Sequence, residues 1–304
     1  MRAFFNRLGN GIFQSSMRIF MPDLARQMQA EGTFEVFGQE ERPVEETDYI
    51  RVVDNGADVT IFAFSGLDVL YAGLARFEFQ NVLKRLGKEA NLVFVRDIHR
   101  LGFHLTPDGR PDGGEFFVNK LNEVKAQLGA THNVAVGSSI GGSAAFYFGS
   151  RCNMEQLIIF GAAFTMDGYT KPRTALRTFL DFKKLFTEPS AYFELVLVTI
   201  GASWARRQLI NRVGEEKLGN PLQAYAETDP KPRITVFYGG TAWPDVAQAL
   251  MLKDYPNAVL NPLPTGRHNT PAFLKKQGSL GDLIGREIQA ALEIKGPEAL
   301  SEAV

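Results

Sequence analysis

Gly137-Ser138-Ser139-Ile140-Gly141 decides the fold, because it joins the apolar run 133–136 to small residues typical of a helix start. It reads G-x-S-x-G. A serine hydroxyl is a weak nucleophile at neutral pH, and it becomes useful when a sharp turn presents its oxygen to a base. The two glycines permit such a turn, because a side chain there would collide with the neighbouring strand or helix. The pattern also arises by chance, so its meaning depends on the elements around it.

The surrounding chain alternates short apolar runs with helical patterns. Short, uniformly apolar strands separated by helices predict an α/β fold with a mostly parallel central sheet and helices on both faces. In such sheets, reactive groups gather at the carboxyl ends of the strands. We expect strands at 49–53, 59–64, 91–95, 133–136, 156–160, 233–238 and 257–260, and helices at 75–87, 115–129, 245–253 and 279–293.

The alternation breaks between residues 165 and 230. This stretch holds a long apolar segment, 192–200, together with Trp204 and the basic pair Arg206-Arg207. We interpret 165–230 as a helical cap insertion that lies over the strand ends. The core then comprises 46–164 and 231–304, and 1–45 forms an N-terminal peripheral segment.

The peripheral segment carries apolar side chains at helical spacing, among them Phe4, Leu8 and Ile12, with arginines beside them. We expect a short helix packed on the body of the protein, and a weak membrane-surface or partner contact is the alternative. The segment lacks the apolar core and cleavage site of a secretory signal.

Composition excludes several classes of function. The chain has 304 residues, 33 basic and 34 acidic, and a formal net charge of −1, so no overall field favours nucleic acid. Cys152 is the single cysteine, which rules out an intrachain disulfide and two-cysteine zinc motifs. No run is long enough to span a bilayer. We therefore expect a cytoplasmic protein without stable membrane insertion, with its oligomeric state undetermined.

Other cofactor and metal signatures are missing as well. The chain has no G-x-x-x-x-G-K-[ST] and no H-E-x-x-H, and the glycines at 137–142 do not have G-x-G-x-x-G spacing. Four scattered histidines make a zinc site a poor interpretation. The sequence therefore predicts neither a cofactor nor a metal.

His268 is the candidate general base, because it follows the last strand on a loop that Gly266 makes adaptable. A surface-loop histidine is the alternative. Asp245, just beyond the strand at 233–238, is the candidate partner for its second ring nitrogen. Asp245 has an alternative role as a cap of the helix that follows it. Asp167 is the competing acid, although the glycine after it is typical of a turn.

The order Ser139, Asp245, His268, the strand–turn–helix setting and the late insertion resemble the α/β-hydrolase superfamily, in its serine-nucleophile branch. The resemblance covers roughly 48–293. It implies that Ser139 lies on a nucleophile elbow and that the catalytic triad consists of Ser139 as nucleophile, His268 as base and Asp245 as acid.

The resemblance also implies an oxyanion hole. One donor would be the backbone N–H of Ile140, and the second that of Leu67, with Gly66 as the less favoured alternative. Relatives often have His-Gly where this chain has Ser65-Gly66. We expect Ser65, Gly66 and His104 to contribute to the substrate site.

Three further polar residues lie near strands. Asp97 and His99 follow the strand at 91–95, whose carboxyl end should face the same cleft. Asp97 is interpreted either as the cap of a turn or as an ion-pair partner of Arg96. His132 precedes its strand, so we expect it at the opposite end of the sheet.

These observations predict an α/β-hydrolase-type serine esterase or thioesterase whose partner is a small-molecule acyl substrate. An acyltransferase using the same three residues is the first alternative, because access of water to the acyl-enzyme decides between the two reactions. A catalytically silent binding protein of the same fold is the second, and Ser65 in place of a histidine favours it.

Overall fold

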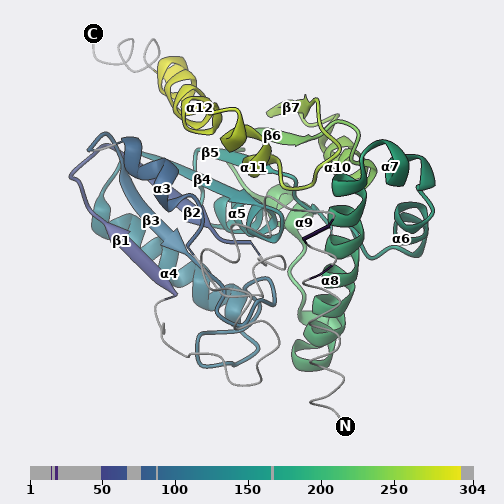
Figure 1. The fold of residues 1–304 in the computed structure, drawn as a ribbon. Coiled ribbons are helices and arrows are strands. Elements are labelled where there is room, and N and C mark those ends of the chain that lie inside the picture. Colours follow the sequence, from purple (N-terminus) through teal and green to yellow (C-terminus); the bar gives the residue numbers. More distant parts are fainter. Residues whose placement is uncertain are drawn as a thin grey trace.

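Within the described residues, seven strands form one central sheet in the computed structural model, in the spatial order β1-β3-β2-β4-β5-β6-β7 (Figure 1). Only β1 is antiparallel to its neighbour, and the other pairs are parallel. The predicted mostly parallel α/β sheet is therefore confirmed. The strands are β1 (Ile50–Val53), β2 (Val59–Phe64), β3 (Asn91–Val95), β4 (His132–Ser138), β5 (Gln156–Phe160), β6 (Arg233–Gly239) and β7 (Ala258–Leu263).

The structure describes residues 15, 18–19, 49–66, 77–86, 88–165 and 168–295. The predicted N-terminal segment, 1–45, lies outside the described residues apart from 15, 18 and 19. Leu67 and Asp167 lie outside them as well.

Helices cover both faces of the sheet, because its central strands are apolar on both sides. Along β2, Phe62 and Phe64 belong to one buried cluster, whereas Ile61 and Ala63 belong to the other. This alternation follows from the two-residue period of a strand. The first face is covered by α4 (Gly113–Leu128), α5 (Ile140–Arg151) and α9 (Pro221–Glu227), and the second by α3 (Gln80–Leu83), α11 (Thr270–Lys276) and α12 (Leu280–Lys295).

The helix predicted at 75–87 is much shorter than expected. It consists of α3 and a single 3₁₀ turn, Lys84–Leu86. Phe79, directly before α3, has φ +60°, in the left-handed region. A right-handed helix cannot extend back through such a residue, so α3 begins at Gln80.

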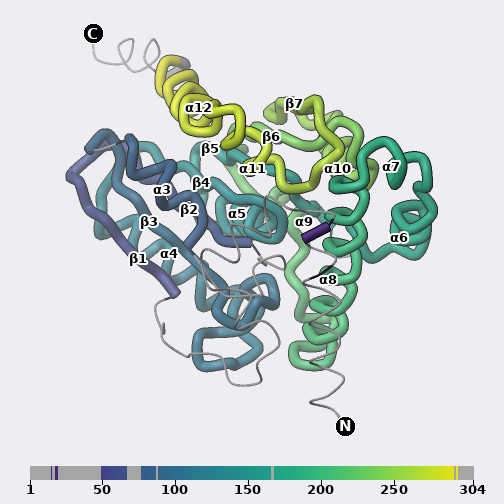
Figure 2. The backbone as a smooth tube through the Cα atoms, viewed as in Figure 1, coloured from purple at the N-terminus to yellow at the C-terminus, as the bar shows by residue number. Residues whose placement is uncertain are grey.

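Between β5 and β6, the predicted insertion is helical, as Figure 2 traces in green. The 25-residue helix α8 runs beside the sheet and contacts both α6 and α7. The last helix, α9, packs on α5 and so contributes to the core face. The boundaries of the insertion remain a prediction. Its helices are α6 (Pro172–Phe179), α7 (Phe182–Thr187), α8 (Pro189–Val213) and α9.

The two glycines of the G-x-S-x-G turn have no space for a side chain. A Cβ on Gly137 would lie 2.1 Å from the carbonyl oxygen of Gly141, and a Cβ on Gly141 would lie 2.4 Å from that of Phe64. Both obstacles are backbone atoms, which cannot rotate away. The start of α5 therefore touches the ends of β2 and β4, and this close approach positions the residue between the glycines.

Gly141→Ala is expected to lower the free energy of unfolding by about 1–3 kcal/mol or more, because the added methyl overlaps the backbone of β2. Urea denaturation measures the change. Gly285→Ala in α12 is the matched control, because its Cβ would find its nearest heavy atom 3.9 Å away. That substitution is expected to be neutral or stabilising by up to about 1 kcal/mol. Equal stability of the two variants would contradict the packing argument.

Candidate active site

Ser139 occupies a sharp turn between β4 and α5. Its backbone has φ +55° and ψ −125°, a conformation that non-glycine residues rarely adopt and that costs about 1–3 kcal/mol. The turn is held in place because the Ser139 N–H donates to the carbonyl of Phe160, at 2.8 Å. The hydroxyl is thereby presented at the carboxyl end of the sheet, and Ser139 lines a cavity there.

His268 and Asp245 meet Ser139 at this edge of the sheet. The His268 Nε2 atom lies 2.8 Å from Ser139 Oγ, and its Nδ1 atom lies 2.9 Å from Asp245 Oδ1. The imidazole and the carboxylate are both buried, with exposed fractions of 4% and 1%. The structure thus brings together three residues that are 129 and 23 positions apart in the sequence.

Asp245 does not act as the N-cap of the helix that follows it. Helix α10 (Trp243–Ala249) has Ala242 at its N-cap, and no side chain caps it. The carboxylate is directed instead at the imidazole of His268. The alternative acid, Asp167, lies outside the described residues.

Tyr169 is a buried member of this network that the sequence did not indicate. Its hydroxyl donates to Asp245 Oδ1 at 2.7 Å and lies 3.3 Å from His268 Nδ1. Burial raises the pKa of the phenol well above its ordinary value, and the neighbouring Asp245 adds to this, so the hydroxyl keeps its proton as a donor. Tyr169 lies just before the cap helices, in a stretch without a motif.

Glu194, on α8, is a second buried carboxyl group near the imidazole. Its side chain is 1% exposed, and Oε1 accepts a hydrogen bond from the backbone N–H of Asn269, the residue after His268. Burial raises its pKa, although this hydrogen bond and the charge of Arg267 oppose the shift. One sequence signal could have indicated Glu194, because it is the single acid in the apolar segment 192–200. Charged residues are almost never fully buried without partners, so an acid in a buried segment indicates a partner nearby.

The pKa of His268 reflects these neighbours. Burial by itself disfavours the imidazolium ion, but the charge and hydrogen bond of Asp245 and the charge of Glu194 outweigh burial. The resulting pKa lies above the ordinary value of histidine. An imidazole with a raised pKa is a stronger base, which suits it to removing a proton from a hydroxyl.

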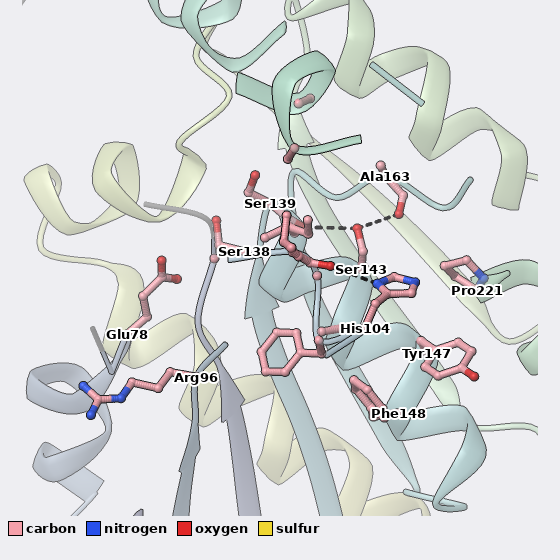
Figure 3. Close-up of a pocket in the computed structure, with 18 of the residues that line it drawn as sticks. Glu78, Arg96, His104, Ser138, Ser139, Ser143, Tyr147, Phe148, Ala163 and Pro221 are labelled. Carbon is pink, nitrogen blue, oxygen red and sulfur yellow. Dashed lines mark hydrogen bonds between the residues drawn. The ribbon is translucent and has the colours of Figure 1, made fainter. Parts of the chain in front are cut away.

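A cavity of about 1030 Å³ opens in front of Ser139. Helix α8 forms one wall of the cavity, and the aromatic side chains of Tyr147 and Phe148 from α5 also line it (Figure 3). Glu78 and Arg96 lie on the opposite side of Ser139 in the same view. The residues that α8 contributes are Glu194, Val198, Ala202, Ala205, Arg206 and Leu209.

His104 and Gly66 line the cavity, whereas Ser65 does not. The Ser65 hydroxyl accepts a hydrogen bond from the Glu78 N–H at 3.1 Å, so it is engaged in holding the loop. His104 Nδ1 lies 3.0 Å from the Leu101 carbonyl, and Nε2 accepts from the Gly219 N–H at 3.3 Å. Burial lowers the pKa of His104, which favours a neutral ring with these two fixed contacts.

Ile140 is the first residue of α5 and also lines the cavity. The N–H groups of a first helical turn have no partner within the helix. The N–H group of Ile140 is therefore available to an anion beside Ser139. Leu67, the other predicted donor, lies outside the described residues. The described part of the predicted oxyanion hole is therefore Ile140 and Gly66.

Asp97 organises the loop that carries His104. Its carboxylate accepts hydrogen bonds from three backbone N–H groups, those of His99, Leu101 and Phe103. This arrangement matches the predicted turn cap. His132 is buried at the first position of β4, at the end of the sheet opposite to Ser139, as expected.

Cys152 offers no competing nucleophile. It is buried after the last turn of α5, and burial raises the pKa of its thiol to about 12. Across the residues that the structure places, no three His, Cys, Asp or Glu side chains are grouped so that they could hold a metal ion. None of the helices in the described ranges is long and apolar enough to cross a bilayer.

No family model and no curated protein matches the sequence. Solved structures do match the fold. A proposed esterase from Staphylococcus aureus is similar over 88% of this chain and 92% of its own, with a TM-score of 0.54 and 13% identity. A carboxylesterase structure from Nitrososphaera gargenis is similar over 81% and 95%, with a TM-score of 0.51 and 12% identity.

MenH from S. aureus matches 81% of this chain and 98% of its own, with a TM-score of 0.50 and 11% identity. At such low identity, the likeness concerns the path of the backbone and not the substrate. The order of the strands, the turn at Ser139 and these structural matches agree, and the chain has the α/β-hydrolase fold.

Proposed function

We propose that the protein is a serine hydrolase that cleaves an ester or thioester through an acyl-enzyme on Ser139. The observation that carries the proposal is the hydrogen-bonded series from Ser139 through His268 to Asp245 beside a large cavity. The esterases among the structural matches support the same reaction class.

In the first half of the reaction, Ser139 Oγ attacks the acyl carbon while its proton passes to His268 Nε2. Asp245 holds the other ring nitrogen and stabilises the imidazolium ion. The N–H of Ile140, with that of Leu67 as the predicted second donor, stabilises the oxyanion. The tetrahedral intermediate then collapses, and the leaving alcohol or thiol takes the proton from His268.

In the second half, His268 removes a proton from water, and the resulting hydroxide attacks the acyl-enzyme. Collapse of the second tetrahedral intermediate releases the carboxylic acid and returns the proton to Ser139. Tyr169 is not in this proton path. Its role in the proposal is to hold the Asp245 carboxylate in position through its short hydrogen bond.

The cavity favours a substrate with an apolar part. Val198, Ala202 and Leu209 give the α8 wall aliphatic side chains. Phe103 and Phe148 are further apolar residues that line the cavity. A volume of about 1030 Å³ is at the upper end of small-molecule sites. We therefore expect an acyl chain of several carbons to be accommodated beside Ser139.

Ser139→Ala is expected to abolish ester and thioester hydrolysis and labelling by a fluorophosphonate probe, because it removes the hydroxyl that is hydrogen-bonded to His268. Turnover should fall by about 10⁴-fold or more. Assays use p-nitrophenyl and coenzyme A esters. Ser138→Ala is the matched control for labelling, since it removes the adjacent hydroxyl and leaves the elbow nucleophile in place. Full activity of Ser139→Ala would reject the mechanism, and an unlabelled native protein would favour a silent binding protein.

The pH dependence of kcat/KM should show its acidic limb above pH 6.5, because His268 must be neutral to accept the proton and its pKa is raised. Glu194→Gln removes one of the negative charges that raise this pKa and keeps an acceptor for the Asn269 N–H. The limb should therefore move to lower pH. Glu123→Gln, in an exposed pair with Lys120, is the control and should not move it. An unshifted limb in Glu194→Gln would contradict the electrostatic argument.

Narrowing the cavity should discriminate between acyl chains. Ala202→Phe adds a ring on the cavity side of α8, so kcat/KM for long-chain esters should fall by more than about tenfold, with acetate esters less affected. Ser203→Phe adds the same ring to the exposed side of the helix and serves as the control. Equal losses for short and long chains would show that the acyl group does not lie along α8.

A further inference from the structure

The helices α6 and α7 expose an unusual amount of apolar surface. Among the large apolar side chains that are exposed in the described part of the chain, five fall between positions 176 and 186. Phe186 is 82% exposed, and the other four are between 37% and 59% exposed. We call this set the α6–α7 patch; its members are Leu176, Phe179, Leu180, Phe182 and Phe186.

The spacing of these residues follows the helices. Leu176, Phe179 and Leu180 lie three and four positions apart along α6 and its end, so they share one side of that helix. Phe182 and Phe186 are four positions apart on α7 and share a side in the same way. An exposed stripe on each of two successive helices differs from the single scattered apolar residues that any surface carries.

The patch is attached to the rest of the molecule through its other side. Lys184 is buried, and its Nζ atom donates to the carbonyl of Thr241 at 2.7 Å. Tyr192 on α8 donates its hydroxyl to the Phe179 carbonyl at 2.9 Å. In Figures 1 and 2, α6 and α7 lie at the edge of the molecule, on the far side of α8 from the sheet. The apolar side chains are thus presented outward from an anchored pair of helices.

Positive charge surrounds the patch. Lys171, Arg173, Arg177 and Lys183 are all exposed within the same segment. Arg173 and Arg177 are one helical turn apart, beside the leucines of α6, and the Arg177 guanidinium lies over the Trp243 ring at 3.6 Å. Two acids lie in the same segment: Asp181, which is half-buried and accepts from the Lys184 N–H, and Glu188, which is exposed. A basic segment in a chain whose net charge is −1 is a local feature and not an effect of composition.

We propose that the α6–α7 patch docks the protein on an anionic lipid surface. Helices with aromatic and leucine side chains on one side and basic residues beside them lie in the interface of a bilayer, where burial of the apolar groups and attraction to acidic head groups act together. Such docking is peripheral and requires no helix that spans the bilayer. It does not depend on the proposed hydrolase reaction.

A second copy of the chain is the other occupant that an apolar surface suggests, and the charges disfavour it. In a two-fold dimer the same surface faces itself, so the four exposed cations of one copy would lie close to those of the other. The two acids of the segment are outnumbered by these four cations, so two such surfaces brought together repel. An anionic lipid surface instead provides the counter-charge and an apolar layer for the phenylalanines.

The test is sedimentation of the full chain with vesicles of phosphatidylcholine alone or mixed with phosphatidylglycerol. We expect partition onto the mixed vesicles that weakens as salt is raised. Phe182→Ser combined with Phe186→Ser should lower the partition coefficient by more than about tenfold. Arg173→Gln combined with Lys183→Gln should lower it by more than about tenfold at low salt. Val259→Ser, which removes an exposed apolar residue from the edge strand β7, is the matched control.

Several results would overturn the proposal. These are absence of binding to mixed vesicles, equal binding to neutral vesicles, or binding that survives both double substitutions. A dimer, measured by light scattering and dissociated by the phenylalanine substitutions, would assign the patch to a second copy instead. Urea denaturation checks that each variant is folded. If the phenylalanine variant is unstable, the charge variant still tests the proposal, because its substitutions leave the core intact. Hydrolysis of a short soluble ester should be unchanged in all of them, which separates this test from that of the proposed function.

Discussion

The close packing of α5 against the ends of β2 and β4 is the constraint on which the site depends. Because Gly137 and Gly141 leave no room for a Cβ, the helix begins within contact of both strands, and Ser139 is held at a positive φ between them. A serine would not adopt this backbone on its own, since it is strained. The packing of the surrounding sheet offsets that strain, and β6 and β7 of the same sheet fix where Asp245 and His268 emerge. Folding and the presentation of the hydroxyl therefore have one physical cause.

The cap insertion takes part in the site as well as covering it. Tyr169, where the insertion begins, donates to the carboxylate of Asp245, and Glu194 on α8 accepts from the backbone beside His268. These contacts bring two buried acids and a phenol around one imidazole. Each group alone is costly to bury, but the hydrogen bonds that they share with the His268 loop offset the cost. The base owes its raised pKa to residues from the core and from the cap together.

Much of this arrangement could be read from the sequence, because short apolar strands and a glycine-flanked serine have local signatures. The strands at 59–64, 91–95 and 156–160 have the bounds that were expected. The pairing of His268 with Asp245 was also accessible, since both residues follow strands whose carboxyl ends meet at one edge of the predicted sheet. Tyr169 and Glu194 were missed because their roles arise from contacts between distant segments. The helix at 75–87 was overestimated because periodicity does not register a left-handed residue such as Phe79.

Helix α7 joins the two surfaces of the cap. Its outward side chains, Phe182 and Phe186, belong to the α6–α7 patch, whereas Lys184 between them is buried against the loop that leads to Asp245. That lysine donates to the Thr241 carbonyl, four residues before the acid, and a Cβ on Gly266 would lie 2.6 Å from its Nζ atom. A single short helix thus contacts the loops of both the acid and the base while exposing its aromatic residues. The contacts of Lys184 therefore fix the position of α7 relative to the loops that carry Asp245 and His268.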